Sequence, residues 1–463
     1  MDDAVLYSLI LLIFLAYGLV VYALYKLKKL EGPSLSLYGI FLMWKTSRGR
    51  KALEKIASAK RFWEAYGDFA IGLCIVGMFV VTGFLLWAAT LVSSIPSDRV
   101  PPVQAMIGIP GLNPFIPIGY GVVALIVAIV IHEFAHGILT YVAKLKVLSL
   151  GVLFFIIPIG AFVEPDEEGL MKIDRRKRSR LFAVGPATNL IAALLFSFIF
   201  TSSMMASVTP VHDGVGVFAV VVDSPADGNI TPGMMIFSFN GSAISDHQSF
   251  AAAVEGTYAG QNVTIGIYEN GATRTINLTL ADRFDFTQDV NDTGKGYLGV
   301  RTILIFTVMG TARTLEVKNG PDFFNPFADM RDPKYFTGSL FAYIGLPLLR
   351  VGGESMSPFP NWFTQFYEVE GFWSFLPADS FWILANVIYW IFWLNLMLGL
   401  TNVLPAVPLD GGYIFRDGLE SVMERTNPDM AAEKREAYVR YVSYFLALFI
   451  LALILWQIIG PRI

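Results

Sequence analysis

The stretch Ile131-His132-Glu133-Phe134-Ala135-His136-Gly137 places two imidazoles and a carboxylate inside an apolar run that extends from Ile118 to Val142. A helix of this length can cross the hydrocarbon core of a bilayer. On such a helix the two histidines lie one turn plus about 40° apart, so both rings reach toward one point. Glu133 projects about 100° round the helix from His132. We therefore expect a polar cluster on a membrane-spanning helix.

This cluster has the H-E-x-x-H spacing in which two histidines bind one zinc ion and the glutamate acts as a base. The whole chain contains four histidines, which are His132, His136, His212 and His247. The alternative is a pair of buried histidines whose hydrogen bonds are satisfied by neighbouring helices. Ionisable groups within a membrane span are costly and usually mark function, and burial alone explains none of the spacing. We therefore predict that His132 and His136 bind a metal ion.

The composition is that of a polytopic membrane protein. The 463 residues are 54% hydrophobic and 16% charged, and the mean hydropathy of +0.56 is far from that of a soluble enzyme. A net charge of −4 is too small to suggest a nucleic-acid partner. The only cysteine, Cys74, lies in an apolar run, which excludes a disulfide bond within the chain.

Six apolar runs predict a polytopic α-helical membrane protein with about six transmembrane helices. The runs are Val5 to Leu24, Phe69 to Ile95, Ile118 to Val142, Leu181 to Met205, Phe381 to about Leu404, and Val442 to Ile459. The first run lacks a small-residue cleavage site, which favours a retained anchor over a removed signal peptide. Lysine and arginine follow the first, third and fifth runs, whereas the loop after the second carries only Arg99. The positive-inside rule then places both chain ends outside and His132 toward the cytoplasmic side.

Two segments, Leu30 to Asp68 and Leu148 to Val163, are not expected to span the membrane. The first is basic and lies on the cytoplasmic side, and together with the first span it makes up residues 1–68. It either lies on an anionic membrane surface or forms a solvated loop. Residues 69–206 contain the next three spans. Within them, Leu148 to Val163 is strand-like and interrupted by glycine and proline, so we expect a membrane-associated β-hairpin beside the histidines.

Residues 211–282 form a soluble insert with β-rich patterning. Asn240-Gly241 and Asn270-Gly271 predict tight turns between strands. Ser245 or Asp246 can cap a helix between these two turns. We therefore expect a small α+β domain between the fourth and fifth spans.

The order of three short motifs in this insert resembles that of a PDZ domain. The motifs are Ser224-Pro225-Ala226, Pro232-Gly233 and Phe239-Asn240-Gly241. An unrelated β-rich insert is the alternative. N-x-S/T sequons at Asn229, Asn240, Asn262, Asn277 and Asn291 all fall in or just after the insert, which favours an outside location. Residues 283–380 are expected to form an outer-side connecting segment.

The last segment, residues 381–463, combines two spans with the stretch Asn395-Leu396-Met397-Leu398-Gly399-Leu400-Thr401-Asn402-Val403-Leu404-Pro405-Ala406-Val407-Pro408-Leu409-Asp410-Gly411-Gly412. Zinc held by two histidines needs another protein ligand if it is to keep an open position, and a carboxylate is the usual one. Asp410 is the best candidate because it follows an apolar span on the same side, while two prolines unwind the helix before it. Glu164 is the second candidate, and a plain helix cap is the alternative role for Asp410.

Together these residues resemble the site-2 protease family of intramembrane zinc metalloproteases. The motifs that carry the resemblance are His132-Glu133-x-x-His136, Gly185-x-x-x-Asn189 and Asn402-x-x-Pro405-x-x-x-Leu409-Asp410-Gly411, in the order of that family. The resemblance covers the third to the fifth span, with the insert in a place that the family uses. It implies Zn²⁺ on His132, His136 and Asp410, Glu133 as general base, Asn402 beside the substrate carbonyl, and substrate positioning by Gly185 and Asn189.

The function implied by the resemblance is zinc-dependent cleavage of single-span membrane proteins within the lipid bilayer, as in regulated intramembrane proteolysis. An edge strand in Leu148 to Val163 would hold an unwound substrate by β-addition, unless the hairpin only fills the core. The alternative is a metal-binding transporter or a catalytically inactive adaptor. Glu133 discriminates between these classes because transport needs metal ligands but no general base.

Overall fold

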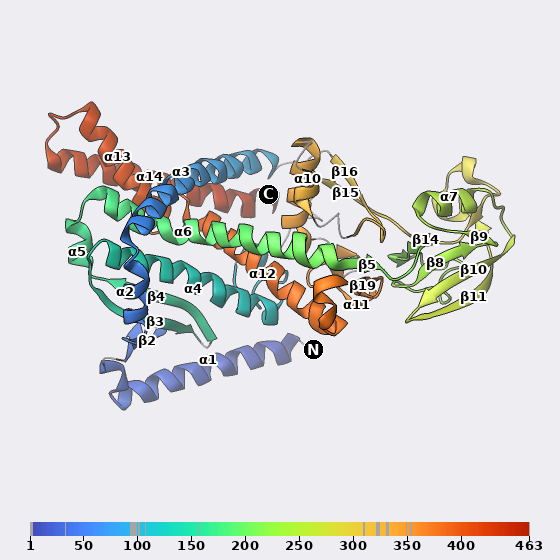
Figure 1. Ribbon diagram of the computed structural model, residues 1–463, viewed down its shortest axis with the longest axis horizontal. Coiled ribbons are helices and arrows are strands. Elements are labelled where there is room, and N and C mark those ends of the chain that lie inside the picture. The colour runs from blue at the N-terminus through green and yellow to red at the C-terminus, as the bar shows by residue number, and fades with distance from the viewer. Residues whose placement is uncertain are drawn as a thin grey trace. The chain divides into compact units, whose positions relative to one another are not determined.

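The computed structural model describes residues 3–32, 34–92, 100, 102–106, 108–155, 157–308, 311–320, 325–329, 333–348, 350–351 and 354–462. The chain divides into two compact units. Unit 1 comprises residues 1–195 and 390–463, and unit 2 comprises residues 196–389. The boundaries fall within two helices, α6 (Arg175–Phe198) and α12 (Ala378–Asn402), which are green and orange in Figure 1.

Five helices in the described ranges are long and apolar enough to cross a membrane. They are α3 (Lys60–Leu91), α4 (Ile118–Val142), α6 with its continuation to Ser207, α12, and α14 (Ala432–Ile459). These five helices coincide with five of the six predicted runs. The remaining run, Val5 to Leu24, lies within α1 (Asp3–Lys26), which is not among these five helices, so the count of six stays a prediction. The predicted end of the second span, residues 93–95, and Arg99 lie outside the described residues.

Ion pairs hold the first turns of α6 against two other helices of unit 1. The Nη2 atom of Arg178 lies 2.6 Å from Oδ1 of Asp417, a buried residue of α13 (Asp410–Thr426). The Nη2 atom of Arg180 lies 2.6 Å from Oδ2 of Asp68 in α3. Removing one partner of the buried Arg178–Asp417 pair would leave an uncompensated charge. These pairs therefore fix the position of α6, which reaches the predicted metal site one to two turns further on.

A four-stranded antiparallel sheet packs beside α4 in the order β1-β2-β3-β4 (Figure 1). The strands are β1 (Leu35–Tyr38), β2 (Phe41–Thr46), β3 (Val147–Phe155) and β4 (Ile157–Pro165). The predicted hairpin from Leu148 to Val163 is confirmed as β3 and β4. Strands β1 and β2 lie in the basic segment for which the sequence indicated only a surface segment or a loop. These two strands are too short, and too charged in their flanks, to give a clear period of two.

Two short helices connect this sheet to the long helices. They are α2 (Arg50–Ala57) and α5 (Glu167–Lys172). Leu53 of α2 is fully buried, and a Cβ atom on Gly137 would lie 2.9 Å from its Cδ1 atom. Gly137, which follows the second histidine, thus lets α2 pack closely on α4.

Unit 2 begins with a β-rich part around one hydrophobic core. Its elements are β5 (Val208–Pro210), β6 (Val215–Gly216), β7 (Ala219–Val220), β8 (Met235–Phe239), β9 (Ser242–Ala243), α7 (His247–Glu255), β10 (Asn262–Glu269), β11 (Ala272–Thr279), β12 (Ala281–Asp282), α8 (Phe284–Thr287), β13 (Gly296–Tyr297) and β14 (Val300–Arg301). The main sheet has the order β11-β10-β8-β6, with β9 paired to β8. This part contains the predicted insert.

The local predictions for the insert are confirmed. Asn240-Gly241 and Asn270-Gly271 have positive φ angles, as tight hairpin turns require. Asp246, rather than Ser245, caps α7, since its side chain accepts a hydrogen bond from the backbone N–H of Ser249. The hydrophobic core continues past residue 282, because Leu298 is buried in it and β14 pairs with β7. Assignment to the PDZ fold stays a prediction.

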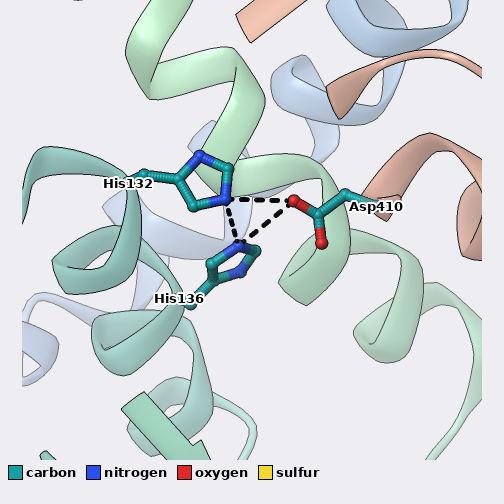
Figure 2. Close-up of side chains that lie close together, drawn as sticks. All are labelled: His132, His136 and Asp410. Atoms are coloured by element: carbon teal, nitrogen blue, oxygen red, sulfur yellow. Dashed lines mark hydrogen bonds and ion pairs between the residues drawn. The ribbon is translucent and has the colours of Figure 1, made fainter. Parts of the chain in front are cut away.

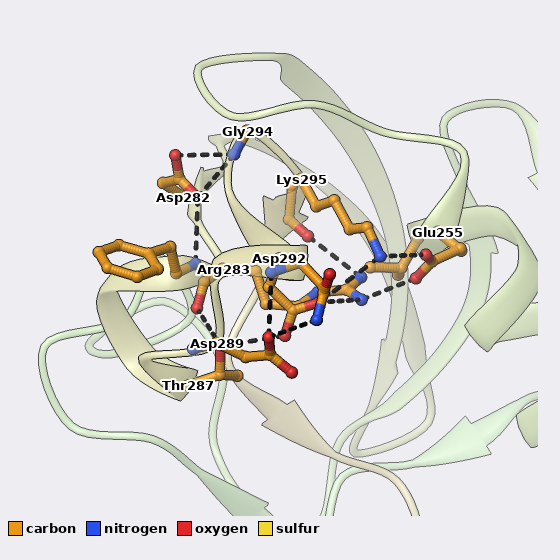
Figure 3. Close-up of polar contacts among 12 residues, drawn as sticks. Glu255, Asp282, Arg283, Thr287, Asp289, Asp292, Gly294 and Lys295 are labelled. Carbon is orange, nitrogen blue, oxygen red and sulfur yellow. Dashed lines mark hydrogen bonds and ion pairs between the residues drawn. The ribbon is translucent and has the colours of Figure 1, made fainter.

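Four charged side chains of this β-rich part form a cluster of ion pairs (Figure 3). Glu255, at the end of α7, lies 2.7 Å from Nη1 of Arg283 and 3.0 Å from Nζ of Lys295. Asp292 lies within 3.7 Å of Arg283 and 3.5 Å of Lys295. Hydrogen bonds to Arg283 and Lys295 hold the pKa of Glu255 below its usual value. The cluster thus links α7 to the segment that leads to β13.

The rest of unit 2 is rich in packed aromatic rings. Its elements are β15 (Leu304–Val308), β16 (Thr311–Leu315), α10 (Pro333–Ile344), β17 (Arg350–Val351), β18 (Glu354–Ser355), α11 (Asn361–Thr364) and β19 (Tyr367–Val369). The ring of Phe200 lies 5.9 Å from that of Tyr343 and 5.5 Å from that of Tyr389. Strand β19 pairs with β5, so the expected connecting segment folds back on the start of the unit.

Candidate metal centre

Three predicted ligands from two distant parts of the chain meet in unit 1 (Figure 2). The Nε2 atoms of His132 and His136 lie 3.0 Å apart. The Oδ2 atom of Asp410 lies 3.1 Å from the first nitrogen and 3.4 Å from the second. The histidines lie one turn apart on α4, and Asp410 is the first residue of α13. All three side chains are largely buried, with exposures of 9%, 13% and 15%.

The contacts behind His132 determine which ring nitrogen faces the cluster. The Nδ2 atom of Asn189 donates to the carbonyl oxygen of Ala128 at 3.1 Å and to Oδ1 of Asn395 at 3.2 Å. Its Oδ1 atom therefore faces Nδ1 of His132, at 2.9 Å. An amide oxygen only accepts hydrogen bonds. The ring hydrogen of a neutral His132 thus lies on Nδ1, and Nε2 presents a lone pair to the cluster.

The second histidine is oriented in the same way. The Nδ1 atom of His136 lies 2.8 Å from the carbonyl oxygen of Leu181 in α6. A carbonyl oxygen only accepts, so this ring also presents the lone pair of Nε2. The backbone of α6 therefore orients one imidazole, and the side chain of Asn189 on the same helix orients the other.

Two nitrogen lone pairs and one carboxylate oxygen thus converge on a small space. Acceptors at these distances repel one another unless a positive group lies between them. A second hydrogen on one ring would bridge one of the contacts, whereas a metal ion satisfies all three together. Two imidazoles and one carboxylate are a ligand set of catalytic zinc, which keeps its fourth position open. The residues present therefore fit a zinc ion.

Gly185 allows α6 to approach the two imidazoles. A Cβ atom on this residue would lie 2.4 Å from Nε2 of His136 and 2.8 Å from Nε2 of His132. No side chain larger than hydrogen fits at these distances. Gly185 and Asn189 lie four residues apart, so the two act on the histidines from one face of α6.

A tight turn between α12 and α13 places Asp410. Helix α12 ends at Asn402, before the two prolines that the sequence analysis identified. A Cβ atom on Gly411 would lie 2.3 Å from the carbonyl oxygen of Val403, and one on Gly412 would lie 2.4 Å from the backbone nitrogen of Val407. The two glycines therefore let the start of α13 pack against the turn, which holds Asp410 beside the histidines.

The cluster opens into a cavity of about 320 Å³ that also contains Glu133 and Asn402. The Oε2 atom of Glu133 accepts a hydrogen bond of 2.9 Å from the backbone N–H of Val163 in β4. Asn402 donates to the carbonyl oxygen of Leu398 in its own helix at 3.1 Å. Five of the predicted site residues, including the three ligands, thus line one cavity. Asn189 and Gly185 lie behind it, and contact of either with substrate stays a prediction.

Glu164, the second candidate for the third ligand, contacts side chains of the sheet instead. Its Oε2 atom lies 3.2 Å from Nζ of Lys45 in β2, and it accepts a hydrogen bond from the hydroxyl of Ser149 in β3. These contacts link three strands of the sheet. Among the described residues, the group that can hold a metal ion consists of His132, His136 and Asp410.

Three residues of the site, Leu181, Val163 and Asn395, had no predicted role. Leu181 and Val163 act through backbone groups, which leave no signature in a sequence. Asn395 carried a signal, because it places an amide inside an apolar helix. In the structure its Oδ1 atom accepts a hydrogen bond from Nδ2 of Asn189, and Asn189 in turn orients His132.

The fold and the site together define a membrane protein with a metallopeptidase-type centre. A family model described as Peptidase family M50 matches residues 120–352 and 362–450, more than half of the chain. The chain therefore belongs to Peptidase family M50, the site-2 protease family. An uncharacterized protein of Methanocaldococcus jannaschii is 24% identical over 444 residues, which cover 93% of this chain and 91% of that protein. Family membership implies a protease, and the apolar helices indicate an integral membrane protein.

Proposed function

We propose that the protein is a zinc-dependent endopeptidase that cleaves the transmembrane segments of single-span membrane proteins. The observation that carries the proposal is the convergence of His132, His136 and Asp410 on a cavity that also contains Glu133. The two histidines and Glu133 lie on an apolar helix of membrane-spanning length. Such a site suits hydrolysis of a peptide bond within the bilayer.

The three ligands would hold the zinc ion, which supplies Lewis-acid chemistry for peptide hydrolysis when bound. Glu133 takes the proton from the attacking water and returns it to the amine that leaves. Its hydrogen bond from Val163 fixes the carboxylate at the wall of the cavity. Asn402 has a second amide hydrogen beyond the one used within its helix, and this hydrogen can donate to the charge that develops on the carbonyl oxygen.

Strand β4 can position the substrate. It is the last strand in the sheet order, and the N–H of Val163 points toward Glu133 rather than toward β3. A helical substrate must unwind before its carbonyl groups are accessible. An unwound segment that adds to this edge would receive backbone hydrogen bonds from Ala161, which lies two residues before Val163 and faces the same way.

We further propose that the metal centre lies toward the cytoplasmic side and that the PDZ-like domain lies outside. Lysine and arginine after the first, third and fifth predicted spans support this orientation. Sequons within the insert support an outside position for it. The competing classes, a metal transporter and an inactive adaptor, leave the role of Glu133 unexplained.

The test is cleavage of labelled single-span proteins by the purified, zinc-loaded protein. Glu133→Gln should retain zinc but lose cleavage by at least about 100-fold, because the amide cannot accept the proton. A zinc chelator should abolish cleavage by the wild type. Glu168→Gln is a matched control, since Glu168 is exposed and its one ion pair among the described residues is with Lys172. Full activity of Glu133→Gln would contradict the proposal.

A further inference from the structure

A second, larger cavity adjoins the one at the metal centre. Its volume is about 720 Å³, and it lies among β1, β2, β4, α5, α6 and α13, all in unit 1. Val163, Pro165, Leu170 and Phe182 line both cavities. A peptide that passes the metal centre along β4 would therefore enter this larger cavity.

The walls suit an extended peptide. Met43 and Phe162 face the cavity from the sheet. On the side of the helices, the rings of Phe182 and Tyr413 stack with centroids 4.5 Å apart and planes 11° apart. Apolar walls of this kind take up side chains with little specificity. Any selectivity must then come from the charged groups.

Four of the charged groups in the cavity neutralise one another. Lys45 pairs with Glu164 at 3.2 Å, and Arg178 pairs with Asp417 at 2.6 Å. Both pairs also stabilise the fold, because the first links β2 to β4 and the second links α6 to α13. They therefore offer no net charge to a ligand.

Arg416 is the remaining charged residue of this cavity. Its side chain is half-buried, and no ion pair or side-chain hydrogen bond joins it to any residue within the described ranges. It also lines a neighbouring cavity of about 430 Å³ that contains Glu433 and Glu436. Glu420 also lines that cavity and pairs with Arg175 at 3.3 Å, and none of the three glutamates forms an ion pair with Arg416. A half-buried guanidinium without a counter-charge is costly, and it gains most from a carboxylate that can accept two hydrogen bonds.

We propose that the larger cavity binds the segment that flanks the cleaved bond, and that Arg416 pairs with an acidic side chain in that segment. This inference rests on the proposed protease function and adds a substrate preference to it. Arg416 lies six residues after Asp410 on α13, about 9 Å along the helix axis. An extended chain covers that distance in about three residues. The acidic residue is therefore expected roughly two to five residues from the scissile bond.

The test compares single-span substrates that differ only by Glu or Gln at one of these positions, in bilayers of neutral lipid. The zinc-loaded wild type should prefer the best Glu substrate by about tenfold or more in kcat/KM, as expected for a charge-assisted hydrogen bond. Arg416→Gln should reduce the ratio to near one, and Arg416→Glu should shift the preference to Lys at the same position. Arg425→Gln is the matched control, because Arg425 is an exposed arginine in the last turn of the same helix.

Binding supplies a second readout that does not depend on cleavage. In a Glu133→Gln background, the Kd values for the Glu and Gln substrates should show the same ratio, and Arg416→Gln should remove it. If this ratio appears while the wild type cleaves nothing, the protease proposal fails and the acidic subsite stands. If the wild type cleaves with no Glu preference at any position, or if Arg416→Gln leaves the preference unchanged, the subsite is wrong. Arg416→Gln could instead lower kcat/KM equally for the Glu and Gln substrates, and only in bilayers that contain anionic lipid. That result would assign Arg416 to binding a lipid headgroup and overturn the inference.

Discussion

The Oδ1 atom of Asn189 lies 2.9 Å from Nδ1 of His132, and this contact determines which nitrogen of the imidazole faces the metal centre. One turn earlier on α6, Gly185 leaves the space that the two imidazoles occupy. The motif Gly185-x-x-x-Asn189 is therefore explained by how α6 packs on α4. Its observed contacts are with the two histidines that are candidate metal ligands.

Removing the amide of Asn189 should weaken zinc binding. Asn189→Leu keeps a similar volume but loses the acceptor for the ring N–H of His132, and partners of this kind typically contribute 10–100-fold to metal affinity. Competition with a chromophoric chelator measures the loss. Thr188→Val is the matched control, because Thr188 is next on the helix and contacts Tyr66 instead. Equal zinc affinity in the two variants would contradict the role assigned to Asn189.

Adding one methyl group at Gly185 should have a larger effect. The new Cβ atom of Gly185→Ala would overlap both Nε2 atoms, so α6 must shift or the rings must turn away. Zinc content and cleavage should both be lost. Gly72→Ala in α3 makes the same change where nothing lies within 4 Å, and should leave zinc content unchanged. Normal zinc content in Gly185→Ala would show that the packing at this point is looser than described.

The third ligand can be tested by comparing two carboxylates. Asp410→Ala removes an oxygen that lies within 3.4 Å of both histidine nitrogens, so it should lose zinc as well as cleavage. Glu164→Gln should keep its zinc, since Glu164 contacts Lys45 and Ser149. Loss of zinc from the second variant but not from the first would reverse the assignment.

The sequence predicted the three candidate metal ligands because they form a spacing pattern with a chemical meaning. His132 and His136 satisfy a helical geometry that a chain with four histidines rarely shows by chance, and Asp410 was found by the need for a carboxylate on the same side. The orientations of the His136 ring and of the Glu133 carboxylate were not predictable, because Leu181 and Val163 act through backbone atoms. Strand β2 was missed because its pairing with β3 joins residues about one hundred positions apart, and β1 was missed because it has only four residues.

The ion cluster around Glu255 should make unit 2 less stable in acid. Hydrogen bonds from Arg283 and Lys295 hold the pKa of Glu255 below the usual 4.5. A lowered pKa in the folded state contributes stability above the unfolded-state pKa, and this contribution is lost as the pH falls through the lowered value. The melting temperature should therefore exceed that of Glu255→Gln at pH 7, with a difference that shrinks in acid.

A control separates this effect from general acid denaturation. Glu368→Gln changes an exposed glutamate of β19 whose side chain forms no ion pair in the described part of unit 2. Its melting temperature should follow that of the wild type at every pH. If Glu255→Gln does the same, the cluster contributes nothing to stability.

The β-rich part of unit 2 should fold alone only if it includes residues beyond 282. Leu298 is 2% exposed in its core, and the carbonyl oxygens of Leu298 and Gly299 accept hydrogen bonds from Ala226 and Val221. Strand β14 adds the pairing with β7. Fully burying a leucine side chain contributes roughly 1.5–3 kcal/mol, a large share of the roughly 5–15 kcal/mol that stabilises a typical domain.

A fragment of residues 214–302 should therefore unfold cooperatively in urea, whereas a fragment of residues 214–282 should show no cooperative transition. Circular dichroism and the dispersion of amide NMR signals measure both. Leu298→Ala in the longer fragment should lower the free energy of unfolding by about 2–5 kcal/mol, because it leaves a cavity among packed side chains. A shorter fragment with the same midpoint as the longer one would place the edge of the domain at residue 282 and remove β14 from its core.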